Sequence, residues 1–216
     1  MTTAVLSLSP DLSRALRLDS LFPVDGLKRV VSTTEGYELL VPEGWLADQT
    51  IARRKAAQAE MARGPLDPPS LRSVRARRPE EPDSAYGPPG STGEENISVI
   101  VADANAYGVR FSLSSLGTPQ EVADKLLAGV IARPGSGKTA TLLSVRERRN
   151  SGLPLYELEF IVRSETPAWE RHNLSLLYGD RRGRLFTLTV QVPEADWATK
   201  QALLRECAAS FHVFET

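Results

Sequence analysis

The chain has 216 residues, which is enough for one well-buried domain and short for two. It carries 26 basic and 27 acidic residues, a formal net charge of −1, and this disfavours nucleic-acid binding because that class has a basic excess. A single cysteine, Cys207, excludes an internal disulfide and a zinc site built on several thiolates. No run of about 18 apolar residues occurs, so no helix is expected to span a bilayer.

The first 35 residues are predicted to form a helical arm. A serine–proline pair favours a helix over residues 11–18, and residues 23–35 are expected to connect it to the main domain. We expect one domain over residues 36–216. Its first strand is predicted over residues 36–41, where a Pro-Glu-Gly-Trp sequence marks a turn. The chain does not start like a secretory signal, because no basic stretch precedes its weakly apolar first residues.

Residues 53–93 differ in composition from the rest of the chain. Between residues 53 and 78 there are eight basic side chains, opposed by Glu60 and Asp67, and a stretch rich in proline and glycine follows. We expect a part-helical segment over residues 51–61 and then an irregular loop, which could be deleted without loss of the fold. The insertion either engages an acidic partner surface or is simply solvated. The candidate partner-binding residues are Arg53, Arg54, Lys55, Arg72, Arg75, Arg77 and Arg78.

The rest of the chain predicts a sheet flanked by helices. One helix begins at Pro119, where Thr118 and Glu121 have the spacing of a capping box. Strands are predicted over residues 96–102, 140–148, 155–163, 172–178 and 184–192, and a closing helix over residues 193–211. Strands joined by short turns are antiparallel. The sequence therefore predicts an α+β protein with a mainly antiparallel sheet of about six strands, covered by helices.

Two motifs have a plain structural alternative. Residues 134–139 resemble a phosphate-binding loop, but the required glycine is replaced by Ala132, and a helix precedes and a strand follows. We expect no nucleotide there. His172 begins a strand and is a candidate metal ligand, although such a histidine is more often only hydrogen-bonded. His212 is expected either to cap the last helix or to begin a short terminal strand.

No catalytic constellation stands out, so we expect no enzyme. Cys207 lies within a predicted helix near its apolar face, which suits a buried structural thiol. Glu157 and Glu159 lie two apart on a strand and share one face. They form either a pair of carboxylates or a solvated face with cross-strand basic partners, and the second is the commoner arrangement.

Several segments, in this order, resemble the PsbP family over residues 36–214. They are residues 36–45 (GYELLVPEGW), 95–101 (ENISVIV), 111–122, 156–160, 171–173 and 209–211. Residues 44–50 and 87–93 look like the lumenal PsbP-domain subgroup. The long basic insertion sets the chain apart from the oxygen-evolving-complex subunit itself.

The resemblance implies an α/β/α sandwich and a place in the chloroplast thylakoid lumen. It implies a non-catalytic extrinsic accessory or assembly protein that docks on photosystem subunits, foremost photosystem II, with peripheral membrane association only. An alternative is a protein that binds or delivers calcium or manganese, because the family resemblance makes His172 a metal ligand with Glu194 or Asp196 as its partner. A second alternative is a Mog-type module that binds a small GTPase.

Overall fold

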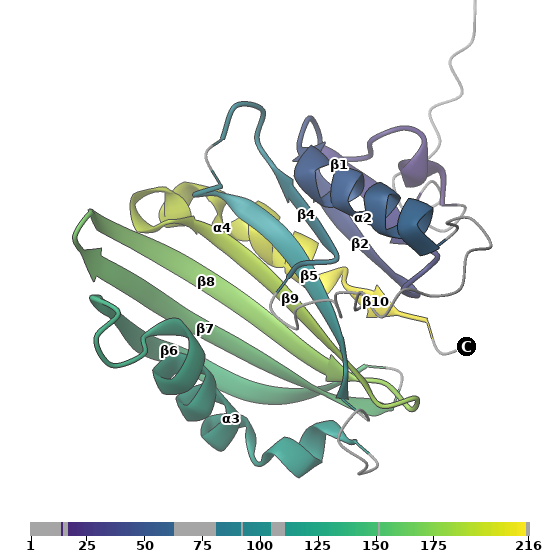
Figure 1. The fold of residues 1–216 in the computed structure, drawn as a ribbon. Helices are drawn as coiled ribbons and strands as arrows, with labels where there is room; N and C mark the ends of the chain where they lie inside the picture. Colours follow the sequence, from purple (N-terminus) through teal and green to yellow (C-terminus); the bar gives the residue numbers. More distant parts are fainter. Residues whose placement is uncertain are drawn as a thin grey trace, which may run out of the picture.

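The strands of this protein form two antiparallel sheets, which a computed structural model describes (Figure 1). The described residues are Arg14 and residues 17–62, 81–91, 93–104, 111–150 and 152–214. Most of the helix predicted over residues 11–18 therefore lies outside them. A short 3-10 helix, η1 (Leu18–Ser20), precedes the first strand.

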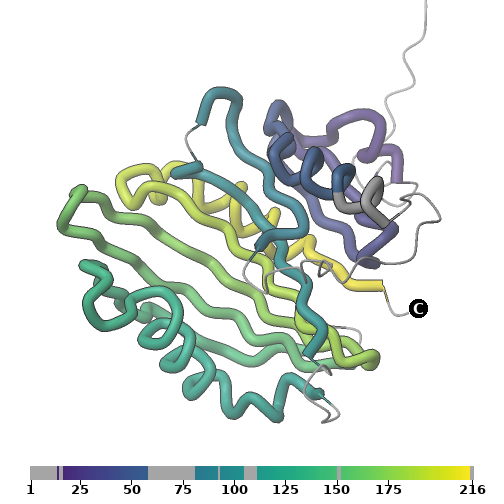
Figure 2. The backbone as a smooth tube through the Cα atoms, in the orientation of Figure 1, coloured from purple at the N-terminus to yellow at the C-terminus, as the bar shows by residue number. Residues whose placement is uncertain are grey.

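The larger sheet has seven strands in the order β3-β4-β5-β9-β8-β7-β6. The strands are β3 (Leu46–Ala47), β4 (Ser84–Gly87), β5 (Asn96–Asp103), β6 (Lys138–Asn150), β7 (Leu153–Glu165), β8 (Ala168–Gly179) and β9 (Arg184–Pro193). From β6 to β9 the chain runs as a meander, because short turns join consecutive strands (Figure 2). The five strands predicted after residue 95 are confirmed, as is the mainly antiparallel α+β class.

A second sheet has three strands, β1 (Leu27–Ser32), β2 (Tyr37–Pro42) and β10 (His212–Val213). Two predictions were wrong here. The first predicted strand belongs to this sheet and not to the large one, and the expected connector over residues 23–35 contains β1. The polar β1 residue Arg29 obscured the strand in the sequence. Its guanidinium donates to Asp19 and Glu38 at 2.8 and 2.9 Å, so two buried carboxylates compensate its charge.

The insertion contributes a strand, which the sequence analysis missed. Its first part is helix α2 (Gln49–Ala62), as predicted. Later, β4 pairs with β3 on one side and β5 on the other, so removal of residues 53–93 would take a strand out of the large sheet. A four-residue strand has too little apolar alternation to be recognised alone. Hydrogen bonding to its neighbours forms it, together with buried Asp83, which accepts a hydrogen bond from Tyr37 at 2.8 Å.

Helix α3 (Pro119–Leu126) begins with the predicted capping box. The Thr118 amide donates to the Glu121 carboxylate at 2.8 Å, and the Glu121 amide donates back to the Thr118 hydroxyl at 3.3 Å. One π-helical turn, η4 (Leu127–Ile131), continues it. Residues 134–137, part of the stretch that resembles a phosphate-binding loop, form a turn between this helix and β6. A helix therefore precedes the turn and a strand follows it, as predicted. No helix in the described ranges is both long and apolar enough to cross a bilayer.

Two apolar clusters lie on opposite faces of the large sheet. Helix α3 packs with β6 and β7 on one face, around Val122, Leu158 and Phe160. Helix α4 (Glu194–Ala209) and the small sheet cover β8, β9 and β5 on the other face. Cys207 is fully buried in this second cluster, and burial raises the pKa of its thiol to about 12, so it is the structural thiol that was predicted.

The second cluster should carry much of the stability. Leu188 on β9 is fully buried, whereas Leu143 at the bulge of β6 is 48% exposed. We expect Leu188→Ala to lower the free energy of unfolding by about 3 kcal/mol, because it removes buried surface and leaves a cavity. Leu143→Ala should change it by less than about 0.5 kcal/mol. Urea denaturation measures both, and equal losses would contradict this assignment of the core.

Candidate functional site

His172 lies at the centre of a buried polar cluster at the start of β8. Its side chain is 3% exposed. Nδ1 lies 2.8 Å from a carboxylate oxygen of Glu194, and Nε2 lies 2.9 Å from one of Glu159. The imidazole stacks on the Trp197 indole, with ring centroids 3.8 Å apart and planes 11° apart. Both ring nitrogens and one face of the imidazole therefore contact a specific neighbour.

Strand register and a helix start bring these residues together. Glu159 lies on the face of β7 opposite the apolar residues that pack under α3. His172 pairs with Ile161 of β7 and with Val192 of β9. Helix α4 begins two residues after Val192, so Glu194 lies beside His172, and Trp197 follows within the first turn.

Charges extend the cluster toward the end of α4. Arg205 donates to the same Glu159 oxygen at 2.6 Å, and its guanidinium lies 5.1 Å from the Trp197 ring centre. Burial of Glu159 disfavours its charged form, but hydrogen bonds from Arg205 and His172 outweigh this effect and lower the pKa of the carboxyl. The order of contacts is Glu194, His172, Glu159 and Arg205.

Of the two acid partners predicted for His172, only one lies in contact with it. Glu194 contacts the imidazole, whereas Asp196 accepts a hydrogen bond from Lys200 at 3.1 Å. An imidazole nitrogen with a carboxylate oxygen suits a transition-metal ion. However, the two carboxylates face opposite ring nitrogens, so they do not converge on one point. In the part of the chain described here, no three His, Cys, Asp or Glu side chains are grouped to hold a metal ion.

Glu157 and Glu159 do not act as a pair. The Glu157 carboxylate accepts from Arg146 at 3.1 Å and from Arg148 at 2.8 Å, across from β6. Glu159 accepts instead from His172 and Arg205. The second alternative of the sequence analysis is confirmed in its cross-strand basic partners, Arg146 and Arg148, but the face is not solvated, because Glu157 is only 9% exposed.

The predicted partner-binding residues on α2 differ in how free they are. Arg53 is exposed. Arg54 lies 3.4 Å from Glu81 and donates to the Pro82 carbonyl at 3.2 Å, and Lys55 forms an ion pair with Asp83. Two of the three basic side chains therefore tie α2 to the start of β4. The other candidates, Arg72, Arg75, Arg77 and Arg78, lie outside the described residues.

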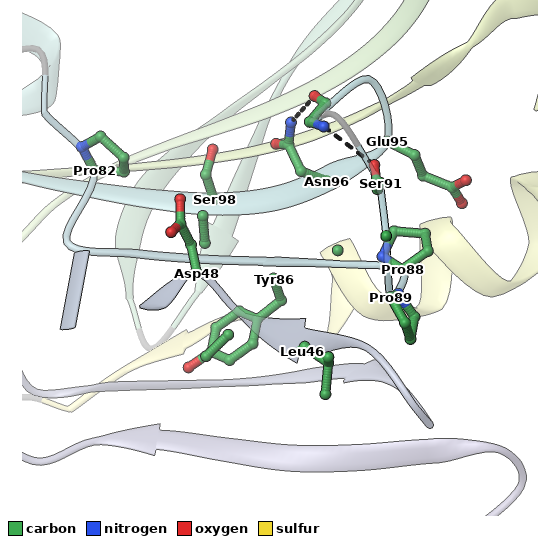
Figure 3. A pocket seen from close by; sticks show the side chains of 15 residues that line it. Leu46, Asp48, Pro82, Tyr86, Pro88, Pro89, Ser91, Glu95, Asn96 and Ser98 are labelled. Carbon is green, nitrogen blue, oxygen red and sulfur yellow. Dashed lines mark hydrogen bonds between the residues drawn. The ribbon is translucent and has the colours of Figure 1, made fainter. Parts of the chain in front are cut away.

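A surface pocket of about 540 Å³ opens beside β4 and the loop that follows it (Figure 3). Its apolar lining comes from Leu46, Tyr86, Pro88 and Pro89. The carboxylates at its rim have partners of their own. Asp48 accepts from Thr50, and this hydrogen bond lowers the pKa of Asp48, while Glu95 accepts from Lys200. The pocket is thus an open hollow of mixed polar and apolar lining, and the carboxylates at its rim do not converge on one point.

The Glu159 contacts predict a pH dependence of stability. A carboxyl with a lowered folded-state pKa stabilises the protein above its unfolded pKa of about 4.3, and this contribution is lost as the pH falls through the folded value. We expect Glu159→Gln to be less stable than wild type at neutral pH, and the difference to shrink below about pH 4.3. Urea denaturation across this range measures it.

Glu147→Gln, at an exposed position on β6, is the control and should track wild type at every pH. A Glu159→Gln deficit that stays constant down to acid pH would contradict the prediction.

Comparison with known proteins places the chain in a family. The PsbP family profile matches residues 25–213. "PsbP domain-containing protein 7, chloroplastic" of Arabidopsis thaliana is 39% identical over 98% of this chain and 74% of its own. CyanoP of Thermosynechococcus vestitus is 29% identical, with 88% of this chain and 87% of that protein aligned. The solution structure of CyanoP from Synechocystis superposes with a TM-score of 0.62 at 25% identity, covering 88% of this chain and 94% of that one. With a fold and a profile match that agree over nearly its whole length, this chain belongs to the PsbP family.

Proposed function

We propose that this protein is a non-catalytic accessory or assembly protein of the photosynthetic apparatus. It docks on photosystem components, foremost those of photosystem II, at the lumenal face of the thylakoid membrane. The observation that carries this proposal is membership of the PsbP family over residues 25–213. The chloroplastic relative from Arabidopsis supports a location in the same organelle.

The insertion is the proposed partner-facing element. Its helix α2 lies along one edge of the large sheet, beside β4 (Figure 1). The ion pairs of Arg54 and Lys55 hold the start of β4 against this helix. These two side chains therefore position the insertion. We assign contact with an acidic surface to Arg53 and to the basic residues from Arg72 to Arg78. The hollow around Tyr86 supplies contact area beside α2.

A variant that neutralises basic side chains, without deleting any residue, tests this assignment and leaves β4 in place. The variant replaces Arg72, Arg75, Arg77 and Arg78 by glutamine. Tagged wild-type protein is expected to recover photosystem subunits from solubilised thylakoids at low salt and to lose them at high salt, because salt screens exposed charges. The variant should recover about tenfold less at low salt, as read by quantitative mass spectrometry.

The matched control replaces four exposed arginines elsewhere, Arg133, Arg163, Arg181 and Arg182, by glutamine. Equal losses in both variants would mean that net charge alone matters. Recovery by the insertion variant at the wild-type level would rule out docking through the insertion.

Divalent-cation binding is a second candidate, which the 2.8 Å contact between His172 and Glu194 favours. An imidazole nitrogen and a carboxylate oxygen are two ligands, and solvent or a partner protein would have to complete the set. Nothing in the described residues favours the Mog-type alternative over these two.

Calorimetric titration with Mn²⁺, Ca²⁺ and Zn²⁺ tests the second candidate. Glu194→Gln should weaken binding of Mn²⁺ or Zn²⁺ by about tenfold, and His172→Ala should abolish it. Asp196→Asn is the control, because Asp196 contacts Lys200 and not the imidazole. Identical heats for all four proteins would exclude a cation site at His172.

A further inference from the structure

The large sheet extends beyond the helix that covers its second face. Helix α4 packs mainly on β2, β8 and β9. The edge formed by β6 and β7 therefore projects past α4, and a groove runs between this edge and the C-terminal half of the helix. Two adjoining hollows of about 200 and 170 Å³ make up this groove. Both are lined by Arg148, Leu176, Ala208 and Ala209.

Arginines form the wall of the groove. Arg146 and Arg148 stand on β6 with side chains 55% and 50% exposed, and Arg205 faces them from α4 with 38% exposed. Arg146 and Arg148 share a single internal carboxylate, that of Glu157, whose side chain is 11% exposed. A guanidinium has five N–H donors, so both keep donors that Glu157 does not use. Positive charge thus exceeds negative charge along this wall.

The floor of the groove is apolar. Leu174 and Leu176 of β8 are 3% and 4% exposed, and Ala208 and Ala209 close the side formed by α4. Each hollow is smaller than the 300 Å³ or more that is usual for a cofactor or drug-sized ligand. The space suits one or two amino-acid side chains, with their apolar parts on the floor and an acidic head at the wall.

We propose that this groove binds an acidic segment of a partner protein, in which glutamate or aspartate side chains pair with Arg146 and Arg148 and apolar neighbours rest on Leu174 and Leu176. Charge complementarity points to this occupant, since these two arginines already hold a carboxylate, that of Glu157, and a guanidinium fork matches a second one. A free anion would leave the apolar floor uncovered. A membrane surface is flat and would not enter the groove.

The groove is separate from the insertion. It lies at the β6 edge of the large sheet, and α2 lies near β4 at the opposite edge (Figure 1). The proposal therefore stands independently of docking through residues 53–93, and variants of the two surfaces can be tested against each other.

The test measures binding of a short fluorescein-labelled peptide of alternating glutamate and leucine to the full-length protein, by fluorescence anisotropy at low salt. The glutamine–leucine peptide is the negative probe. Arg146→Gln/Arg148→Gln should weaken binding of the acidic peptide about tenfold, the size expected for loss of charge-assisted hydrogen bonds. Arg133→Gln/Arg163→Gln makes the same charge change on exposed residues elsewhere and should leave affinity within about twofold of wild type.

A second variant, expected to bind more tightly, separates a binding role of the two arginines from a loss of folding. Loss of both arginines leaves Glu157 buried without a partner, which could destabilise the protein. Glu157→Gln frees both guanidinium groups and leaves them in place, so it should bind the acidic peptide several-fold more tightly than wild type. A purely structural role of Arg146 and Arg148 predicts no such gain.

Three outcomes would overturn the proposal. The first is no binding of the acidic peptide by wild type. The second is unchanged affinity in both Glu157→Gln and the folded arginine variant, with folding checked by circular dichroism. The third is an arginine variant that still binds the peptide but no longer binds vesicles of anionic phospholipid. That result would make the groove a lipid site.

Discussion

Strand β7 sends Leu158 and Phe160 toward α3 and sends Glu157 and Glu159 toward α4, because successive side chains of a strand point to opposite faces. This alternation makes β7 the strand on which the rest of the molecule depends. Its apolar face closes the cluster under α3. Its acidic face carries two carboxylates to a depth at which each needs positively charged or N–H partners. Arg146 and Arg148 are the partners of Glu157, and His172 and Arg205 are the partners of Glu159.

Buried carboxylates of this kind give less net stability than their short distances suggest, since desolvation offsets much of the attraction. Their structural effect is to specify which elements meet. Glu159 joins β7 to β8 through His172 and to α4 through Arg205. In the same way, Arg29 joins β1 to Asp19 and Glu38, and Asp83 joins the start of β4 to Tyr37. The Arg29 and Asp83 networks attach strands that the sequence pattern barely marks, β1 and β4, to β2, which it marks clearly.

The two proposed docking surfaces lie at opposite edges of the large sheet and differ in how their basic side chains are paired. At one edge, Arg54 and Lys55 form ion pairs with Glu81 and Asp83 and so attach α2 to the start of β4. At the other edge, the arginines of β6 compensate Glu157 and still face solvent. The His172 cluster lies between these edges, under α4, with both ring nitrogens engaged. Arg205 belongs both to this cluster and to the wall of the groove at the β6 edge, so the two are adjoining.

The sequence by itself determined the elements with strong local patterns, namely the meander from β6 to β9, strand β5, the capped start of α3 and the burial of Cys207. Local periodicity and capping chemistry suffice there, because each signal lies within one element. At the site, it identified His172 and, through the family resemblance, Glu194 or Asp196. Only the tertiary structure chose Glu194, added Glu159 and Arg205, and assigned β2 to a second sheet with β1. Those choices depend on contacts between residues far apart in the chain, such as Glu159 and Arg205, which no local pattern encodes. Strand β4 was missed for the same reason, because its neighbours in the sheet, and not its own four residues, make it a strand.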